Sequence, residues 1–427
     1  MVHQHFTLAD NLTVQENITL GVHSLLKFSL GRAAARARII ALSTQFRLAV
    51  SPDARVGTLS VGERQRVEIL KALYRDVRIL ILDEPTAVLT PQETDDLFAT
   101  LRLSIKEGLS IIFISHKLHE VMAIADRVVV LRHGKMAGGV DTKETDKNAL
   151  AAMMMGTEAT PPDVSPATPG APLLALRAVT TPDIGSIPGL KSVSLDLKAG
   201  QIVGLAGVSG NGQAAMADVV GGVLNPSDGA VVLGAETVQK WTPRIAVQSG
   251  IARIPEDRHK TGTIADFDLV ENAILERYTS LPFSKAGWLN WRKSRAFADG
   301  IIDKYDVRCP GSDTPIRLLS GGNMQKLILG RVLEADPQII LANQPVRGLD
   351  IGAINYVHSQ LLAARDRGAA VLLISEDLDE VMALSDVIHV ISDGRLSPAF
   401  QRGEMTPATL GLWMAGQGFE TDMPHAS

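Results

Sequence analysis

Two neighbouring carboxylates, Asp83 and Glu84, directly follow the short apolar run Ile79–Leu82. Such a run suits a strand buried inside a parallel sheet, and two acidic side chains at its end are costly unless a partner compensates their charge. A Mg²⁺ ion held by Asp83 and a water molecule activated by Glu84 would explain both acids and would form a hydrolytic centre. The alternative is that the two acids only cap the turn after the strand.

A second candidate group, Ser60 and Gly62, stands at the start of an expected helix that runs through Val67, Leu70 and Leu73. A serine hydroxyl and the N–H groups of a helix N-terminus suit the γ-phosphate of a nucleotide. An ordinary N-cap would look the same locally, so these residues alone leave both interpretations open.

The glycine-rich segment Gly207–Ala214 follows a strand-like run and has the skeleton of the phosphate-binding loop G-x-x-x-x-G-K-[ST]. Its glycines would let backbone N–H groups wrap a phosphate, but Gln213 replaces the lysine and Ala214 replaces the hydroxyl that would bind Mg²⁺. Taken alone, the segment is better explained as a glycine-rich turn between strand and helix. The candidate nucleotide-binding residues here are Gly207, Gly210, Gly212 and Gln213.

A constant offset relates two halves of the chain and favours the functional interpretations. Leu59–Glu63 is matched by Leu319–Asn323, 260 residues further on. The same offset relates the acidic pair to Asn343-Gln344, and relates His116 to Glu376. A register held over this length indicates two tandem copies of one domain. The copies differ most at the chemical residues, so one half retains the chemistry and the other is degenerate.

His116 lies just past the apolar run Ile111–Ile114, the next expected strand after the acidic pair. A buried histidine of the core is one interpretation of this position. The repeat favours the other, in which the imidazole reaches a γ-phosphate, whereas Glu376 in its place would repel one.

Buried strands and helices alternate along both copies, which indicates an α/β fold whose ligands sit at the carboxyl ends of the strands. A helix is expected from Thr90, with Pro91 in its first turn and Glu93 closing a capping box, to Gly108. Residues 157–171, rich in Pro, Thr and Ala, have no regular period and are expected to form a linker. We therefore expect domains at 1–156 and 172–420.

Composition narrows the class of protein. The chain is 45% apolar and carries a net charge of −5, so it lacks the basic footprint of a nucleic-acid-binding protein. Cys309 is its only cysteine, which excludes an internal disulfide and favours a reducing compartment. No apolar run is long enough to span a bilayer and the first residues do not resemble a signal peptide. A cytoplasmic location is expected, with any membrane contact made through a partner.

Together these motifs resemble the ATP-binding cassette (ABC) family. Leu59–Glu63 and Leu319–Asn323 resemble its signature motif, Asp83-Glu84 its Walker B motif, and His116 its switch histidine. Gln4 resembles the Q-loop glutamine, and Thr90 and Asp350 fall in the D-loops. The likeness implies two tandem P-loop NTPase domains with helical subdomains that bind ATP and Mg²⁺.

The resemblance also implies roles for residues. Glu84, His116 and Gln4 would be catalytic, Asp83 and Gln4 would bind the metal, and Ser320, Gly321 and Gly322 would complete the competent ATP site. Ser60 and Gly62 would complete the degenerate one. A fused pair of this kind resembles the ATPase subunits of simple-sugar and nucleoside importers. The resemblance is slightly greater to the nucleoside branch. Such subunits lie on the inner face of the plasma membrane against permease subunits and act indirectly with a substrate-binding protein.

The sequence departs from the family pattern at its start. Gln4 corresponds to Glu256, so a first phosphate loop matching Gly207 would fall before Met1. The expectation is a first domain that is incomplete and hydrolyses ATP poorly. A non-catalytic remnant that docks on a permease is the alternative. A cassette protein acting on nucleic acid or ribosomes is disfavoured, because such proteins usually carry two intact sites.

Overall fold

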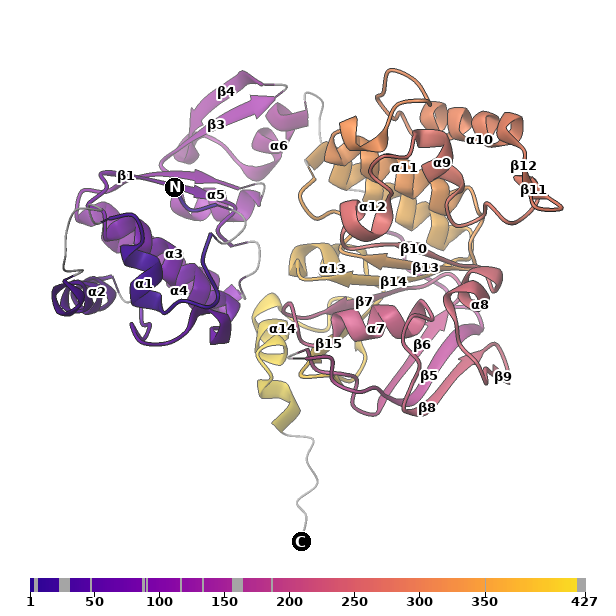
Figure 1. Ribbon diagram of the computed structural model, residues 1–427, viewed down its shortest axis with the longest axis horizontal. Coiled ribbons are helices and arrows are strands. Elements are labelled where there is room, and N and C mark those ends of the chain that lie inside the picture. Colours follow the sequence, from indigo (N-terminus) through magenta and orange to yellow (C-terminus); the bar gives the residue numbers. More distant parts are fainter. Residues whose placement is uncertain are drawn as a thin grey trace, which may run out of the picture. The chain divides into compact units, whose positions relative to one another are not determined.

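The computed structural model forms two compact units, residues 1–159 and 160–427, which are described separately (Figure 1). The structure describes residues 1–3, 7–22, 31–46, 48–86, 89, 91–115, 117–132, 134–155, 164–185, 187–349 and 351–420. Four residues named above, Gln4, Thr90, His116 and Asp350, lie outside these ranges, as does part of the expected linker.

Unit 2 is built on a seven-stranded sheet in the order β10-β13-β14-β7-β15-β16, with β17 paired to β15. β7 pairs in parallel with both β14 and β15, and all of its residues are buried. Its sequence therefore carries a continuous apolar run, as expected for a strand covered on both faces. The strands are β7 (Ile202–Ala206), β10 (Ile251–Ile254), β13 (Ile339–Asn343), β14 (Ala370–Ser375), β15 (Val387–Ser392), β16 (Arg395–Leu396) and β17 (Phe400–Gln401).

A second, antiparallel sheet in the order β6-β5-β8-β9 covers the opposite face of the helix that follows β7 (Figure 1). Buried residues of this helix, α7 (Gln213–Val220), share one core with residues of both sheets. The second sheet consists of β5 (Pro172–Thr180), β6 (Val193–Lys198), β8 (Asp228–Leu233) and β9 (Glu236–Thr237), and the hairpin β11 (Ser284–Lys285) and β12 (Trp288–Leu289) stands apart.

The remaining helices of unit 2 include a cluster of α9, α10 and α11 beside the β10 edge of the main sheet (Figure 1). They pack with α12 and the far side of the sheet into a second core. The helices are α8 (Pro243–Gln248), the π-helix η3 (Arg258–Gly262), α9 (Leu269–Ile274), α10 (Trp291–Lys304), η4 (Ile316–Leu318), α11 (Gly321–Leu333), α12 (Ile351–Asp366), α13 (Leu378–Leu384), α14 (Pro407–Met414) and η5 (Gln417–Glu420).

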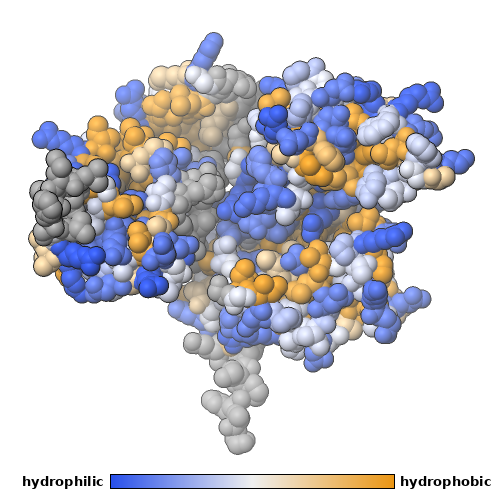
Figure 2. Space-filling view, viewed as in Figure 1, coloured by the Kyte–Doolittle hydropathy of each residue, from blue (hydrophilic) through white to orange (hydrophobic). Residues whose placement is uncertain are grey.

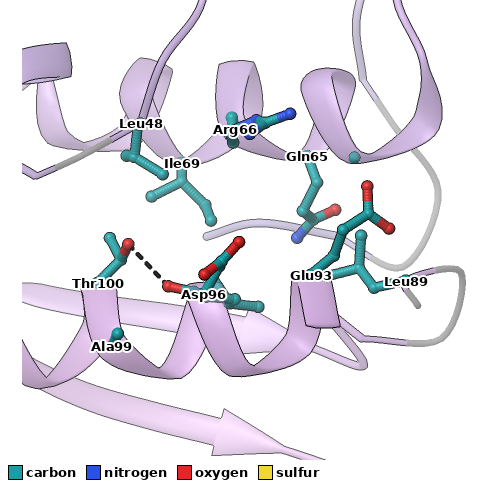
Figure 3. Close-up of a pocket in the computed structure, with 11 residues that line it drawn as sticks. Leu48, Gln65, Arg66, Ile69, Leu89, Glu93, Asp96, Ala99 and Thr100 are labelled. Carbon is teal, nitrogen blue, oxygen red and sulfur yellow. Dashed lines mark hydrogen bonds between the residues drawn. The ribbon is translucent and has the colours of Figure 1, made fainter. Parts of the chain in front are cut away.

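Unit 1 repeats part of this plan around its own core. A cavity lies between its helices α3 and α4 (Figure 3). Its elements are α1 (Val14–Thr19), α2 (Arg32–Gln45), η1 (Val56–Thr58), α3 (Val61–Leu73), β1 (Ile79–Asp83), α4 (Pro91–Lys106), β2 (Ser110–Ile114), α5 (Leu118–Ile124), β3 (Arg127–Arg132), β4 (Lys135–Asp141), η2 (Thr142–Glu144) and α6 (Lys147–Met155).

The strand pairing of unit 1 follows the repeat and then departs from it. β1 pairs with β2 as β13 pairs with β14, and the bridge between Val2 and Leu82 repeats the pairing of Ile254 with Ala342. In unit 2, however, β7 separates β14 from β15, whereas no described strand of unit 1 lies between β2 and β3. β2 and β3 therefore belong to two separate two-stranded sheets.

This difference leaves apolar side chains of unit 1 in contact with solvent. Ile114 in β2 is 45% exposed, while its counterpart Ile374 in β14 is fully buried beside β7. Leu131 in β3 and Met136 in β4 are also exposed, and Figure 2 shows apolar side chains gathered over these two strands. The cause is the absence of a central strand among the described residues, since strand pairing supplies both hydrogen bonds and cover.

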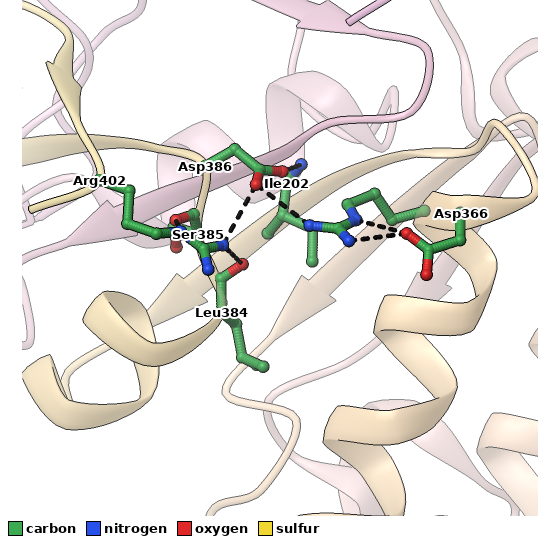
Figure 4. Close-up of polar contacts among 7 residues, drawn as sticks. Ile202, Asp366, Leu384, Ser385, Asp386 and Arg402 are labelled. Carbon is green, nitrogen blue, oxygen red and sulfur yellow. Dashed lines mark hydrogen bonds and ion pairs between the residues drawn. The ribbon is translucent and has the colours of Figure 1, made fainter. Parts of the chain in front are cut away.

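Asp386 fixes the start of β7 in unit 2 (Figure 4). Its carboxylate accepts a hydrogen bond of 2.8 Å from the Ile202 N–H and bonds of 3.1 Å from the guanidinium groups of Arg365 and Arg402. The side chains of Asp386 and Arg365 are 9% and 2% exposed, so this charge pair is largely desolvated. One carboxylate thus connects β7 to the end of α12 and to the loop after β17.

Replacing Asp386 by Asn should therefore lower the free energy of unfolding of unit 2 by about 3 kcal/mol, because removing one partner leaves a buried charge uncompensated. Urea unfolding measures this when it is followed both by tryptophan fluorescence, which reports on unit 2 because all four tryptophans lie there, and by far-UV circular dichroism, which reports on both units. Asp126→Asn is the matched control, since Asp126 occupies the same repeat position and the described residues offer its carboxylate no partner. It should shift unfolding by under about 0.5 kcal/mol. Equal shifts from both variants would contradict the role given to Asp386.

Candidate functional site

The acidic pair lies at the carboxyl end of β1, where it was expected. Asp83 is the last residue of the strand, and its N–H donates to the Val2 carbonyl over 3.1 Å. Glu84 follows in a left-handed conformation, with φ of +45°, and its N–H donates to the Ile114 carbonyl over 2.9 Å. The backbone of this pair is thus fixed by the neighbouring strand β2 and by the segment containing Val2.

Unit 2 keeps this backbone and changes only the side chains. Gln344 has φ of +50°, and its N–H donates to the Ile374 carbonyl over 2.8 Å. Its side-chain oxygen accepts from the N–H of Glu376, the counterpart of His116, over 3.5 Å. A left-handed conformation costs a residue other than glycine about 1–3 kcal/mol. Both copies retain it, so they differ in charge and not in shape.

The N-terminus of α3 contains a capping box that the sequence allowed for. The Ser60 hydroxyl donates to the Glu63 carboxylate over 2.9 Å and accepts from the Glu63 N–H over 3.3 Å. The hydroxyl proton is therefore engaged by a carboxylate, and that carboxylate adds negative charge where a phosphate would bind. The ordinary N-cap interpretation of Ser60 describes this geometry.

The N-terminus of α11 is neutral at the same position. The Asn323 amide donates to the Ser320 hydroxyl oxygen over 3.0 Å, and its carbonyl oxygen accepts from the Arg308 N–H over 2.9 Å. Because Ser320 accepts in this contact, its hydroxyl proton remains available for an anion. The two serines thus differ in what they can offer a phosphate.

The glycines beside these serines lie against opposite charges. A Cβ on Gly62 would come within 2.2 Å of a Glu93 carboxylate oxygen, whereas a Cβ on Gly321 would come within 3.2 Å of the Arg258 guanidinium. A Cβ on Gly322 would meet only the Ala353 side chain at 3.9 Å. The start of α3 is therefore lined by acids and the start of α11 by a base, which favours anion binding at α11.

Arg258 is a residue that motif spacing did not single out for this role. Its guanidinium donates to the Arg347 carbonyl over 3.0 Å, and desolvation by burial lowers its pKa from the ordinary value. Arg347 in turn forms an ion pair of 2.5 Å with Glu256, the residue at the Q-loop position of unit 2. The only earlier signal was that Arg258 follows Glu256 closely in the sequence.

A second unexpected group is the buried Glu120, which connects the two segments that follow β1 and β2. Its carboxylate accepts from the Thr86 hydroxyl over 2.6 Å and from the Ser115 hydroxyl over 3.1 Å. Thr86 lies two residues after Glu84, and Ser115 directly precedes His116. Glu120 is therefore a positioning residue for both candidate catalytic segments, and its recurrence as Glu380 was the available signal.

The glycine-rich loop of unit 2 joins β7 to α7, and Gln213 folds back into it. Its side-chain amide donates to the Val208 carbonyl over 2.8 Å and accepts from the Asn211 N–H over 3.1 Å. Gly210 and Gly212 have φ of +84° and +114°, which only glycine adopts readily. The loop thus has the shape of a phosphate loop, while Gln213 uses one of its N–H donors.

Among the described residues of unit 1, one candidate ligand has the chemistry that Mg²⁺ requires. Asp83 offers a carboxylate at the strand end, and Mg²⁺ commonly uses one or two carboxylates together with phosphate oxygens and water. Among the residues that the structure describes, no group of three or more His, Cys, Asp or Glu residues could hold a metal by itself. Gln4, the other expected ligand, lies outside the described ranges.

Within the described residues, none of the helices combines the length and apolar character needed to cross a membrane.

Comparison with known proteins supports the same interpretation. The family described as ABC transporter matches residues 1–87 and 190–347. The chain is 45% identical over 417 residues to the guanosine import ATP-binding protein NupO of Bacillus subtilis, covering 97% of this chain and 82% of that protein. It is 34% identical over 412 residues to the ribose import ATP-binding protein RbsA of Clostridium perfringens, covering 95% and 80%.

A solved structure shares the fold at low sequence identity. The complex of archaeal ribosomal stalk protein aP1 and the archaeal ribosome recycling factor aABCE1 contains a chain that matches with a TM-score of 0.63 at 19% identity, covering 95% of this chain and 74% of that one. With the acidic strand end, the capped signature helices and the glycine loop in place, these matches establish that the chain belongs to the ATP-binding cassette (ABC) transporter family.

Proposed function

We propose that this chain is the ATP-binding subunit of an ABC importer for nucleosides or simple sugars, acting through an integral-membrane permease. The observation that carries the proposal is that the two matching strand ends share one backbone conformation but differ in the charge of their side chains. Asp83 and Glu84 supply two charges in unit 1, while Asn343 and Gln344 supply none in unit 2. Such asymmetry suits one hydrolytic half and one binding half.

In the hydrolytic half, Asp83 would hold Mg²⁺, which neutralises charge on the phosphates when bound. Glu84 would accept a proton from the attacking water, and the bond of its N–H to the Ile114 carbonyl fixes its backbone at the strand end. Glu120 holds the segments carrying Glu84 and His116 through Thr86 and Ser115. Gln4 and His116 remain candidates for the metal and the γ-phosphate.

The helix α11 would bind a nucleotide phosphate through Ser320, Gly321 and Gly322. The free hydroxyl proton of Ser320 and the guanidinium of Arg258 support this assignment. Ser60 and Gly62 would bind a phosphate more weakly, because the carboxylates of Glu63 and Glu93 lie beside them. The two signature helices therefore support different roles.

The relatives support a class of solute and a set of partners. The relative named for guanosine import is more similar than the one named for ribose import, at 45% against 34% identity, which supports a nucleoside solute. A permease would be the direct partner at the inner face of the plasma membrane, and a substrate-binding protein an indirect one. ATP and Mg²⁺ are the corresponding cofactors.

Uptake of radiolabelled guanosine or ribose into vesicles that contain the chain and its permease tests this proposal. Glu84→Gln should reduce ATP-dependent uptake by at least about 100-fold, because a general base contributes about 10²–10⁴ in rate. Gln344→Ala, at the matching position of unit 2, should leave uptake within a few-fold of the unchanged protein. Binding to the permease without ATP-dependent uptake would instead support the non-catalytic docking role, and uptake that is unaffected by Glu84→Gln would contradict the role given to Glu84.

The second experiment concerns the nucleotide site of unit 2. In the Asp83→Asn full chain, which lacks the expected Mg²⁺ ligand of unit 1, labelled ATP should bind with little dependence on Mg²⁺, because the loop of unit 2 lacks the hydroxyl and its strand end lacks the acids that hold the metal. Gln213→Lys should tighten binding, since an ammonium would meet the phosphates and the Asn211 N–H would be released. It should not restore turnover.

Gly212→Ala provides the negative control for that experiment. A Cβ there would meet the Ile391 side chain at 2.9 Å, and the residue would be held at φ of +114°. This change should abolish the gain from Gln213→Lys. Tight binding that requires Mg²⁺, or no gain from Gln213→Lys, would show that the loop does not bind phosphate in the proposed way.

A further inference from the structure

The cavity between α3 and α4 of unit 1 has a volume of about 230 Å³ and polar groups on both walls (Figure 3). Gln65 extends from α3 towards α4, and Asp96 and Glu93 extend from α4 to either side of it (Figure 3). Ile69 and Leu97 form part of the apolar lining. Of the motif residues in the proposed function, Gly62 lies at the edge of this cavity, whereas Gln65 and Asp96 have no role in that function.

The repeat shows how the cavity arises. Asp96 stands where unit 2 has Tyr356, whose ring packs edge-on against Tyr305 and lies 5.4 Å from the Lys326 ammonium. Glu93 likewise stands where unit 2 has Ala353. In unit 2 an aromatic ring of α12 therefore lies near Lys326 of α11, whereas unit 1 has a carboxylate at the same position and a cavity between α3 and α4.

Gln65 places an unpaired hydrogen-bond donor on the cavity wall. Its side chain is 4% exposed and its amide nitrogen has no hydrogen-bond partner. The counterpart Gln325 donates from the same atom to the Pro345 carbonyl over 2.7 Å. The Arg66 Nε, also buried, has no partner either. Buried donors without acceptors cost about 1–3 kcal/mol each, so an external acceptor would stabilise this wall.

The charges around the cavity restrict the ligand. An anion would satisfy the Gln65 and Arg66 donors, but the Asp96 and Glu93 carboxylates would repel it. A cation would suit the carboxylates and leave the donors unpaired. A hydroxyl group accepts from an amide or guanidinium and donates to a carboxylate at the same time. The lining therefore suits a neutral molecule that carries several hydroxyl groups.

We propose that this cavity binds a small neutral polyol of the size of a pentose, with hydroxyl groups between the Gln65 amide and the Asp96 carboxylate. Its volume lies below the roughly 300–1,000 Å³ of pockets for drug-sized ligands, which fits a small ligand. Ile69 and Leu97 would contact the carbon face of the ring.

The place of the cavity connects it to the signature helix. Gly62, in the first turn of α3, lines the cavity, and Glu93 packs against it. A ligand between Gln65 and Asp96 would therefore change the surroundings of the α3 N-terminus. Polyols are also the chemical class of a pentose or of the ribosyl group of a nucleoside. If the cavity senses the imported solute, that role rests on the proposed function. Binding of a polyol in the cavity does not depend on it.

Titration of the purified full chain with D-ribose, by calorimetry or ligand-observed NMR, tests the inference. The unchanged chain should bind ribose saturably. Asp96→Tyr, which copies unit 2, should abolish binding, and Asp96→Asn, which keeps the size, should weaken it about tenfold through loss of a charge-assisted hydrogen bond. Asp95→Tyr is the matched control, because Asp95 is exposed like Asp96 but does not line the cavity, and it should bind as the unchanged chain does.

Three results would overturn the proposal. Ribose that does not saturate the unchanged chain would mean that the cavity holds only water. Saturation by putrescine in place of ribose would show a cation site, and binding unaffected by Asp96→Asn and Asp96→Tyr would place ribose elsewhere. Vesicle uptake that depends on Glu84 but is unaffected by Asp96→Tyr would agree with the proposed function. It would show only that this cavity does not regulate uptake.

Discussion

The pairing of β7 with two neighbours is the constraint on which the position of the glycine-rich loop of unit 2 depends. The strand lies between β14 and β15, and the carboxylate of Asp386 fixes its first N–H. The glycine loop can begin only where this strand ends, so its position follows from the sheet. Unit 1 shows the converse, because without a described strand between β2 and β3 its sheet divides and Ile114 becomes exposed.

The two units demonstrate that the family backbone and the family chemistry are separable. Glu84 and Gln344 share a left-handed conformation and the same backbone hydrogen bond, yet only one carries a charge. The signature helices likewise begin with similar caps, but Glu63 occupies the Ser60 hydroxyl whereas Asn323 leaves that of Ser320 available. The charge at a strand end or at a helix N-terminus can therefore change through single side chains while the backbone stays the same.

Polar groups at a distance from the motifs determine how the motifs are presented. Glu120 joins the segments after β1 and β2, and Arg258 brings a guanidinium to the start of α11. The cavity beside α3 belongs to the same pattern, since Asp96 places a carboxylate there where unit 2 has the partly buried ring of Tyr356. In each case one residue from a different element alters what a helix N-terminus or strand end can bind.

The sequence by itself determined the repeat, the α/β class and most local structure. Apolar runs predicted β1, β2 and β7 closely, and the expected helix between Thr90 and Gly108 appears as α4, Pro91–Lys106. These features depend on neighbours in the chain, so pattern and capping residues suffice. Only the tertiary structure decided that Gln213 folds into its own loop, that Arg258 reaches Gly321, and that Gln65 lacks a partner. Those outcomes depend on side-chain direction and on contacts between distant segments, which spacing along the chain does not encode.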